Sequence, residues 1–203
     1  MIQLYWSPRS RSISAIWLME ESGLPYERVL TDISTGAQKA PDYLKINPMG
    51  KVPALSDGDA ALGEAAAICA YIADRYPETK LAPAVTDPRR ARYLQWLFFS
   101  PGCIEPAITD RAFPRQEQAR RSMLGYGDFD TVMSVLAKAV EPGPYLLGEQ
   151  FTAADVVVGS TLRWGLMFSL LPTRPEFMAY VGRFEQRPAL QRATALDQEL
   201  AAA

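Results

Sequence analysis

The stretch at residues 47–55, Asn-Pro-Met-Gly-Lys-Val-Pro-Ala-Leu, constrains the fold of this chain more than any other. Asn-Pro and Met-Gly are turn dipeptides, and Val-Pro-Ala-Leu is typical of the start of a buried strand. Because proline has no N–H, Pro53 is expected at a tight turn that opens the strand, with a cis Val52-Pro53 bond as one form of it. A cis turn leaves the Val52 N–H and C=O free to pair with another peptide. An ordinary loop-to-strand turn fits the same residues.

Two further segments give this turn a context. Residues 62–68 read Leu-Gly-Glu-Ala-Ala-Ala-Ile, and residues 151–156 read Phe-Thr-Ala-Ala-Asp-Val. In this order and at this separation, the three segments make the chain resemble a soluble (cytosolic-type) bacterial glutathione S-transferase, from Leu4 to about Ala193. The resemblance implies a glutathione-binding N-terminal domain and a helical C-terminal domain.

The order of elements predicts the same fold class, α/β followed by all-α. A β-α-β unit, an irregular segment with a short helix, and a β-β-α unit indicate a thioredoxin-like domain at 1–78 and a linker at 79–87. A helical bundle domain is expected at 88–203. The expected strands are 2–6, 26–30, 52–56 and 60–62, and the expected helices are 13–22, 41–46, 64–76, 89–112 with a break near Pro101-Gly102, 114–140, a helix after 152, 174–186 and 189–200.

Thr152 and Asp155 form a capping-box pattern at the start of one of these helices. Thr152 is expected to cap the helix, and Asp155 to reach back to the Thr152 N–H. This structural role explains the pattern fully, so we assign it no chemistry.

The composition excludes several kinds of site and cellular location. The chain has no histidine, which removes Ser-His-Asp catalysis, Cys-His catalysis and His-ligated metals. Cys69 and Cys103 form no CxxC or zinc spacing and are expected to be buried thiols. A formal net charge of −2 argues against nucleic-acid and anionic-membrane partners, and no apolar run could cross a bilayer. Without a secretory leader pattern, we expect a cytoplasmic protein that needs no metal.

Glutathione carries an ammonium, two carboxylates and a thiol, and the resemblance implies where these groups bind. Val52, beside Pro53, is expected to pair its backbone with the cysteinyl part. Glu64 would accept from the γ-glutamyl ammonium, and the first N–H groups of its helix would hold the γ-glutamyl carboxylate. A glutamate favoured by the helix dipole explains Glu64 without any ligand. The family usually has Ser or Thr next, whereas this chain has Ala65, which predicts binding weakened about tenfold.

The glycine carboxylate of glutathione needs a cation or an amide from the segment before the proline turn. The candidates are Lys51, Lys39 and Gln38. Of these, Lys51 directly precedes Val52. Solvated surface lysine is the alternative for at least one of the two lysines.

The thiol must be ionised to react, and the turn at 7–12 lies where the family places its sulfur-activating residue. A serine hydroxyl could donate to the thiolate, while helix capping is the alternative role for these serines. Arg9 and Arg11 could add positive charge, and Arg11 stands about where some bacterial members have a cysteine. The catalytic candidates, in order of preference, are Ser10, Ser12, Ser7 and Tyr5.

The second substrate is expected in an apolar pocket between the domains, although most aromatic residues at helical spacing belong to a core. The candidates are Phe98, Phe99, Cys103, Phe113, Trp164 and Phe168. The resemblance implies a homodimeric detoxification enzyme that adds the glutathione thiolate to a hydrophobic electrophile. Reduction of disulfides or peroxides with glutathione in the same site, and a binding protein without catalysis, are the alternatives.

Overall fold

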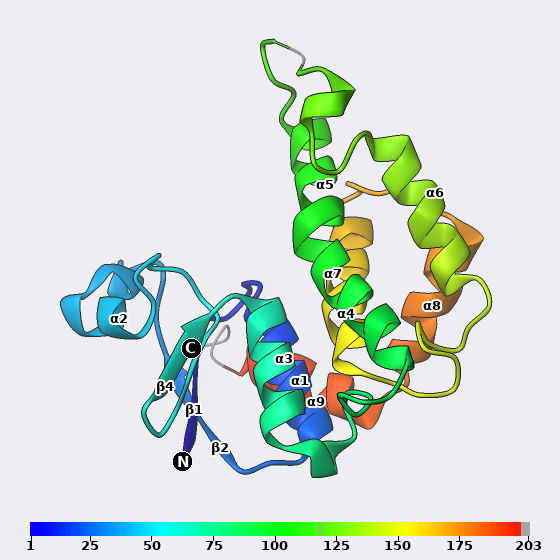
Figure 1. Cartoon of the computed structure of the whole chain (residues 1–203). Coiled ribbons are helices and arrows are strands. Elements are labelled where there is room, and N and C mark those ends of the chain that lie inside the picture. The colour runs from blue at the N-terminus through cyan, green and yellow to red at the C-terminus, as the bar shows by residue number, and fades with distance from the viewer. Residues whose placement is uncertain (118, 200–203) are drawn as a thin grey trace. The chain divides into compact units, whose positions relative to one another are not determined.

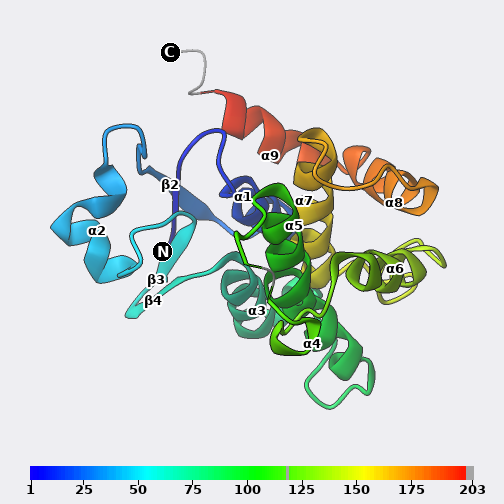
Figure 2. The same cartoon turned by 90° about the horizontal axis from the view of Figure 1, so that it is seen from above.

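The computed structural model describes residues 1–117 and 119–199 and divides into two compact units (Figures 1 and 2). One unit contains residues 1–81 together with the described residues from Gln186 onward, and the other contains residues 82–185. The last helix of the chain therefore packs as part of the N-terminal unit. The domain boundaries expected from the sequence stay a prediction.

The first unit is built on a four-stranded mixed sheet in the order β2-β1-β3-β4. The central strand β1 is parallel to β2 and antiparallel to β3, with Tyr5 opposite Ala54. This topology confirms the predicted α/β class and thioredoxin-like order. The elements are β1 (Ile2–Trp6), α1 (Ile13–Ser22), β2 (Tyr26–Leu30), η1 (Ala37–Lys39), α2 (Pro41–Ile46), β3 (Ala54–Asp57), β4 (Ala60–Gly63), α3 (Ala65–Arg75), η2 (Pro77–Thr79) and α9 (Pro188–Gln198).

Alternation along β1 explains how the layers form. Ile2, Leu4 and Trp6 are buried, whereas Gln3 and Tyr5 are half-buried. Both views show α1 and α3 on one side of the sheet and α2 on the other (Figures 1 and 2). The buried residues of α1 include Ile16, Trp17 and Leu18, so the core of this unit lies between the sheet and α1.

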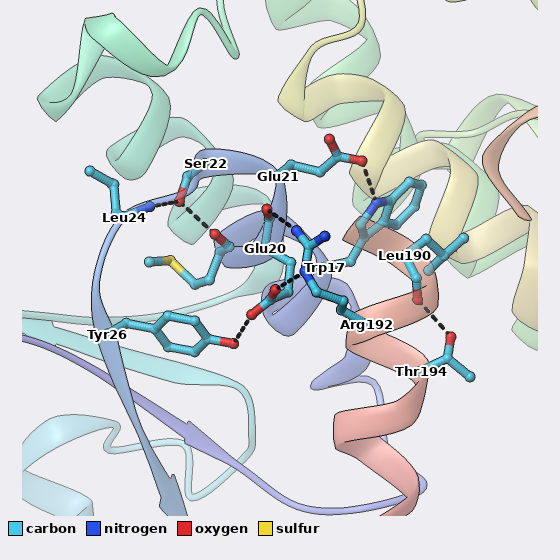
Figure 3. Close-up of polar contacts among 10 residues, drawn as sticks. Trp17, Glu20, Glu21, Ser22, Leu24, Tyr26, Leu190, Arg192 and Thr194 are labelled. Carbon is cyan, nitrogen blue, oxygen red and sulfur yellow. Dashed lines mark hydrogen bonds and ion pairs between the residues drawn. The ribbon is translucent and has the colours of Figure 1, made fainter. Parts of the chain in front are cut away.

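Helix α9 is attached to α1 by two ion pairs. Arg192 Nε donates to Glu20 Oε2 at 2.7 Å, and Tyr26 donates its hydroxyl to the same carboxylate (Figure 3). The Arg187 guanidinium forms a bidentate pair with Glu21, at 2.6 and 2.7 Å. The Arg187 and Glu21 side chains are 26% and 7% exposed, against 55% and 16% for Arg192 and Glu20, so the Arg187 pair is the more desolvated of the two.

We expect Arg187→Ala to lower the free energy of unfolding by about 2 kcal/mol, because it leaves the buried Glu21 carboxylate without its cation. The matched variant Arg192→Ala removes a solvent-exposed partner and should cost less than about 1 kcal/mol. Urea denaturation of both variants checks this difference. Equal losses would contradict the distinction between a desolvated and an exposed pair.

The second unit is helical, as predicted. Its α7 helix runs through the centre, since every residue from Ala153 to Leu162 is buried. A π-helical segment separates α4 from α5, which confirms the break expected near Pro101-Gly102. The elements are α4 (Arg89–Phe99), η3 (Ser100–Ile104), α5 (Glu105–Ala112), η4 (Arg121–Met123), α6 (Phe129–Val140), α7 (Ala153–Met167) and α8 (Pro175–Glu185).

One helix boundary predicted from the sequence is wrong. The helix expected to begin at Pro114 begins instead at Phe129. Asp128 has an extended backbone and accepts from the Thr131 N–H at 2.8 Å, so it is the true N-cap. Gly127, at φ 75°, immediately precedes this cap and is incompatible with a continuous helix.

The capping box at the start of α7 is confirmed. Asp155 Oδ2 accepts from the Thr152 N–H at 2.8 Å and from the Thr152 hydroxyl at 2.9 Å. Its other oxygen accepts from the Leu146 N–H at 2.9 Å and the Tyr180 hydroxyl at 2.8 Å. Burial raises the pKa of this carboxyl, and the four donors act in the opposite direction. Asp155 therefore connects the start of α7 to the loop before it and to α8.

Within the described ranges, no helix combines the length and apolar character that a membrane span requires.

Candidate functional site

The register of the sheet brings three turns to one end of it. The turn at 7–12 follows the last residue of β1, and the proline turn precedes Ala54, which pairs with Tyr5. Ala54 also pairs with Gly63, the residue before Glu64 and the start of α3. The candidate residues from these three turns are therefore grouped at the carboxyl end of β1.

The proline turn presents a backbone edge. The Val52-Pro53 bond is cis, the form considered from the sequence. The ladder of β3 begins at Ala54, so the N–H and C=O of Val52 lie outside it. Val52 is half-buried and Pro53 is buried, which leaves Val52 placed to pair with an extended peptide.

Two buried side chains hold the proline turn in place. The Tyr43 hydroxyl and the Asn47 side-chain amide, at 2.8 Å, both donate to the Lys51 carbonyl. Asn47 also packs against Gly63, where an added Cβ would lie 2.7 Å from its Nδ2 atom. Sequence reasoning treated Asn47 only as part of a turn dipeptide and missed Tyr43. The sequence signal for this contact was their spacing from Lys51, which is four residues for Asn47 and eight for Tyr43.

Lys39 supports the same loop from η1. Its ammonium donates to the Met49 carbonyl at 3.1 Å, and an added Cβ at Gly50, φ 60°, would lie 2.6 Å from its Nζ atom. The Lys51 side chain is exposed beside Val52. Lys39 thus has a structural use for one of its three donors, and both lysines stay candidates for a carboxylate.

The start of α3 combines a carboxylate with helix N–H groups. Glu64 is exposed and has φ 63° and ψ 114°, a left-handed conformation that is strained for a residue with a Cβ. The first bond of the helix runs from the Ile68 N–H to the Glu64 carbonyl at 2.9 Å. The N–H groups of residues 65–67 therefore have no intrahelical acceptor and form an anion-binding end beside Ala65.

The serine turn, residues 7–12, is held together by hydrogen bonds of its own hydroxyls. Ser10 Oγ lies 2.7 Å from the Ser7 carbonyl and 2.8 Å from Ser12 Oγ, and it accepts from the Ser12 N–H at 3.1 Å. Ser7 and Ser12 are almost fully buried, at 1% and 0% exposure, whereas Ser10 is half-buried. Of the three, Ser10 is thus the hydroxyl that a ligand could reach. Its single proton would have to leave the Ser7 carbonyl or Ser12 to do so.

Tyr5 lies on the other face of the sheet from Leu4 and Trp6. Its hydroxyl donates to Gln3 Oε1 at 3.3 Å, and its ring packs edge-on against Tyr43 with centroids 5.7 Å apart. Strand alternation turns only one of these two neighbours toward the core, since Trp6 is 1% exposed and Tyr5 is half-buried. Tyr5 remains the weakest catalytic candidate.

Arg9 and Arg11 flank Ser10 in this turn. Arg9 is exposed and takes φ 53°, and Arg11 is half-buried. The Arg11 carbonyl accepts from both the N–H, at 3.2 Å, and the hydroxyl, at 2.8 Å, of Ser14. The turn therefore continues into α1 through backbone bonds, and Arg11 stays a candidate for the positive charge beside a thiolate.

The six candidates for an electrophile site all lie in the second unit. Phe98, Phe113 and Phe168 are 60%, 76% and 56% exposed, and the other three, Phe99, Cys103 and Trp164, are half-buried. The expectation that most of this set is core is wrong. The apolar core of this unit is supplied by other residues, such as Phe177 and Phe184, at 0% exposure.

The cysteines show no sign of reactivity. Cys69 is fully buried, as expected, and Cys103 is half-buried, which was not expected. Burial raises the pKa of both thiols, which disfavours their thiolates. Among the residues that the structure describes, no cluster of three or more His, Cys, Asp or Glu side chains could hold a metal ion.

Comparison with known families gives two matches. The family model for the glutathione S-transferase N-terminal domain matches residues 2–74, and that for the C-terminal domain matches residues 126–188. Glutathione S-transferase 3 of Zea mays is 32% identical, with 96% of this chain and 93% of the relative covered. The disulfide-bond oxidoreductase YfcG of Escherichia coli K12 is 28% identical, with 95% and 94% covered.

A solved structure extends this likeness to three dimensions. The glutathione transferase homologue from Sulfitobacter, crystallised with bound glutathione, has a TM-score of 0.75 and 29% identity to this chain. The match covers 97% of this chain and 98% of the homologue. The similarity in sequence and in fold thus extends over both units.

Proposed function

Because this chain belongs to the glutathione S-transferase family, we propose that it binds glutathione at the three grouped turns and transfers its thiolate to an electrophilic small molecule. The observation that carries the proposal is the edge formed by Val52 beside the N-terminus of α3. An extended peptide can pair with Val52 while a free carboxylate on its first residue meets the helix N–H groups. Glutathione has both features.

Each turn has its own role in this proposal. Val52 and Pro53 align the cysteinyl part, and Glu64 with the N–H of Ala65 holds the γ-glutamyl end. Lys51 or Lys39 neutralises the glycine carboxylate, and Arg11 adds positive charge beside the thiolate. Ser10 donates a hydrogen bond to the sulfur, which stabilises the thiolate over the thiol. Catalysis then comes from thiolate stabilisation and proximity, without a protein base.

A second reaction has one observation in its favour. YfcG, a relative of similar coverage, is named a disulfide-bond oxidoreductase, so reduction of disulfides or peroxides by glutathione is the alternative for the same site. Cys69 lies in α3 and Cys103 in η3, so neither belongs to the turn at 7–12, and burial disfavours both thiolates. We therefore favour conjugation over reduction.

Parallel assays with one enzyme preparation separate the candidates. Conjugation is measured with a panel of aryl halides and enones, and reduction with a glutathione-capped disulfide and a peroxide. Turnover of electrophiles well above that of disulfides supports the transferase. The reverse order supports the reductase, and glutathione binding without turnover of any substrate supports a binding protein.

Replacing Ala65 should strengthen glutathione binding. We expect Ala65→Ser to tighten the dissociation constant about tenfold, because a hydroxyl at the first helical position adds one bond to a charged carboxylate. Calorimetric titration checks this, with Ala70→Ser, at a half-buried position farther along the same helix and outside its anion-binding end, as the control. An unchanged affinity in Ala65→Ser would remove the role proposed for this position.

The location of the second substrate and the oligomeric state are part of the same proposal. We place the hydrophobic electrophile near the exposed aromatic residues of the second unit, including Phe98, Phe113 and Phe168. We also propose a cytoplasmic homodimer with a role in detoxification. Sedimentation of the purified protein tests the dimer.

A further inference from the structure

The serine turn contains a residue in a conformation that its side chain disfavours. Arg9 has φ 53°, in the left-handed region where glycine is the usual residue. An arginine keeps this conformation only when its surroundings hold it there. Because Ser10 is the next residue, the backbone of Arg9 sets the direction in which the Ser10 hydroxyl projects.

The contact that holds Arg9 comes from the other end of the chain. The Arg9 N–H donates to Asp197 Oδ2 at 3.2 Å, and Asp197 lies in the last turn of α9. The other carboxylate oxygen, Oδ1, is buried and has no hydrogen-bond partner among the described residues. Desolvation raises the pKa of this carboxyl, and the Arg9 N–H opposes that rise. The Asp197 carboxylate is thus held where its burial is unfavourable, in contact with the serine turn.

Asp197 reaches the turn from a helix that is fixed along its length. At its start, the N-cap residue Arg187 is paired with Glu21 of α1. Farther along α9, Arg192 is paired with Glu20 (Figure 3). At its end, the Arg28 guanidinium donates to the Leu196 carbonyl at 3.0 Å and lies over the Trp6 ring, 5.2 Å from its centroid. Arg28 therefore places the residue before Asp197 against the end of β1, where the serine turn begins.

We propose that Asp197 is a positioning residue, which holds Arg9 in the left-handed conformation and so directs the Ser10 hydroxyl toward the glutathione sulfur. This inference rests on the proposed function. It adds that the docking of α9 controls how strongly the sulfur is activated. Asp197 acts through the backbone and touches neither the substrate nor the reacting atoms.

The decisive readout is the pKa of the bound glutathione thiol, followed by ultraviolet absorbance of the thiolate. Asp197→Ala should raise this pKa toward that of free thiol and lower kcat about tenfold, with the dissociation constant of glutathione changed less than about twofold. Asp197→Asn keeps an oxygen acceptor and should give an intermediate loss. Gln198→Ala, at an exposed neighbour on α9, should change neither quantity.

A second substitution tests the mechanism itself. Arg9→Gly added to Asp197→Ala should return kcat to the value of Arg9→Gly alone, because glycine takes the left-handed conformation without support. A simple loss of stability would not be rescued in this way. An unchanged thiol pKa in Asp197→Ala, or no recovery in the double variant, would overturn the proposal.

Amide-proton exchange of the free protein keeps this test separate from the proposed function. Without any ligand, Asp197→Ala should accelerate exchange at Arg9 at least several-fold, and Gln198→Ala should not. If the wild-type protein binds no glutathione, the proposed function fails while this effect on the turn still appears. Unchanged exchange in Asp197→Ala would overturn the inference, whatever the protein binds.

Discussion

Ser10→Ala is expected to lower the rate of glutathione conjugation on the order of 10²-fold, the usual cost of removing one hydrogen-bond donor from a developing or stabilised anion. The thiol pKa of bound glutathione should rise toward about 8.5, the value of a free thiol. The pH at which the rate reaches half its maximum should therefore move upward. Affinity should change little, because Val52 and the α3 N-terminus still hold the rest of the peptide.

Steady-state rates against pH, with calorimetric affinities, check this prediction. The matched control is Ser14→Ala, which removes a neighbouring hydroxyl that donates to the Arg11 carbonyl at 2.8 Å and is outside the proposed site. It should keep the wild-type pH profile. Ser12→Ala removes a fully buried partner of Ser10 and is expected to have a smaller effect than Ser10→Ala. If Ser12→Ala has the larger effect on the thiol pKa, Ser12 is the sulfur-contacting residue.

Asp155→Ala is expected to lower the free energy of unfolding by about 3–5 kcal/mol, the largest loss predicted here for stability. The change would leave the N–H groups of Leu146 and Thr152 and the Tyr180 hydroxyl without their acceptor. Asp155 itself is 0% exposed, so water cannot replace the lost bonds without rearrangement. Urea denaturation followed by circular dichroism measures the effect.

Asp128→Ala is the matched control for helix capping. Asp128 caps α6 through the Thr131 N–H but lies near solvent, where water can satisfy the freed donor. It should cost clearly less than Asp155→Ala. Comparable losses would mean that Asp155 acts only as a helix cap, without the added cost of buried, unpaired donors.

The N-terminal unit could be predicted in detail because its signals are local. Ile2–Trp6 and Tyr26–Leu30 are strands with the predicted bounds, and α1 ends at Ser22 as predicted, with Gly23 at φ 66° as its C-cap. Pro53 restricts the backbone of the turn before it, and Gly58 takes the positive φ of 59° that the hairpin turn requires. Both signals act locally, whatever the rest of the chain does.

The features that the sequence did not reveal depend on contacts between distant residues. The packing of α9 on α1 joins Glu20 and Glu21 to arginines more than 160 positions away, and one-sequence patterns carry no such pairing. The left-handed Arg9 is unexpected for a residue with a side chain. The start of α6 was misplaced because proline suits a first turn but does not by itself begin a helix.

Calorimetric titration of the purified protein and of the Glu64→Gln variant with reduced glutathione tests binding at the three turns most directly. We predict saturable binding at one site per chain, weakened several-fold in Glu64→Gln, where the charge that meets the γ-glutamyl ammonium is lost. Absence of heat and of saturation in the wild-type protein would contradict glutathione binding at the three turns. Binding of equal strength in both proteins would place the ligand elsewhere.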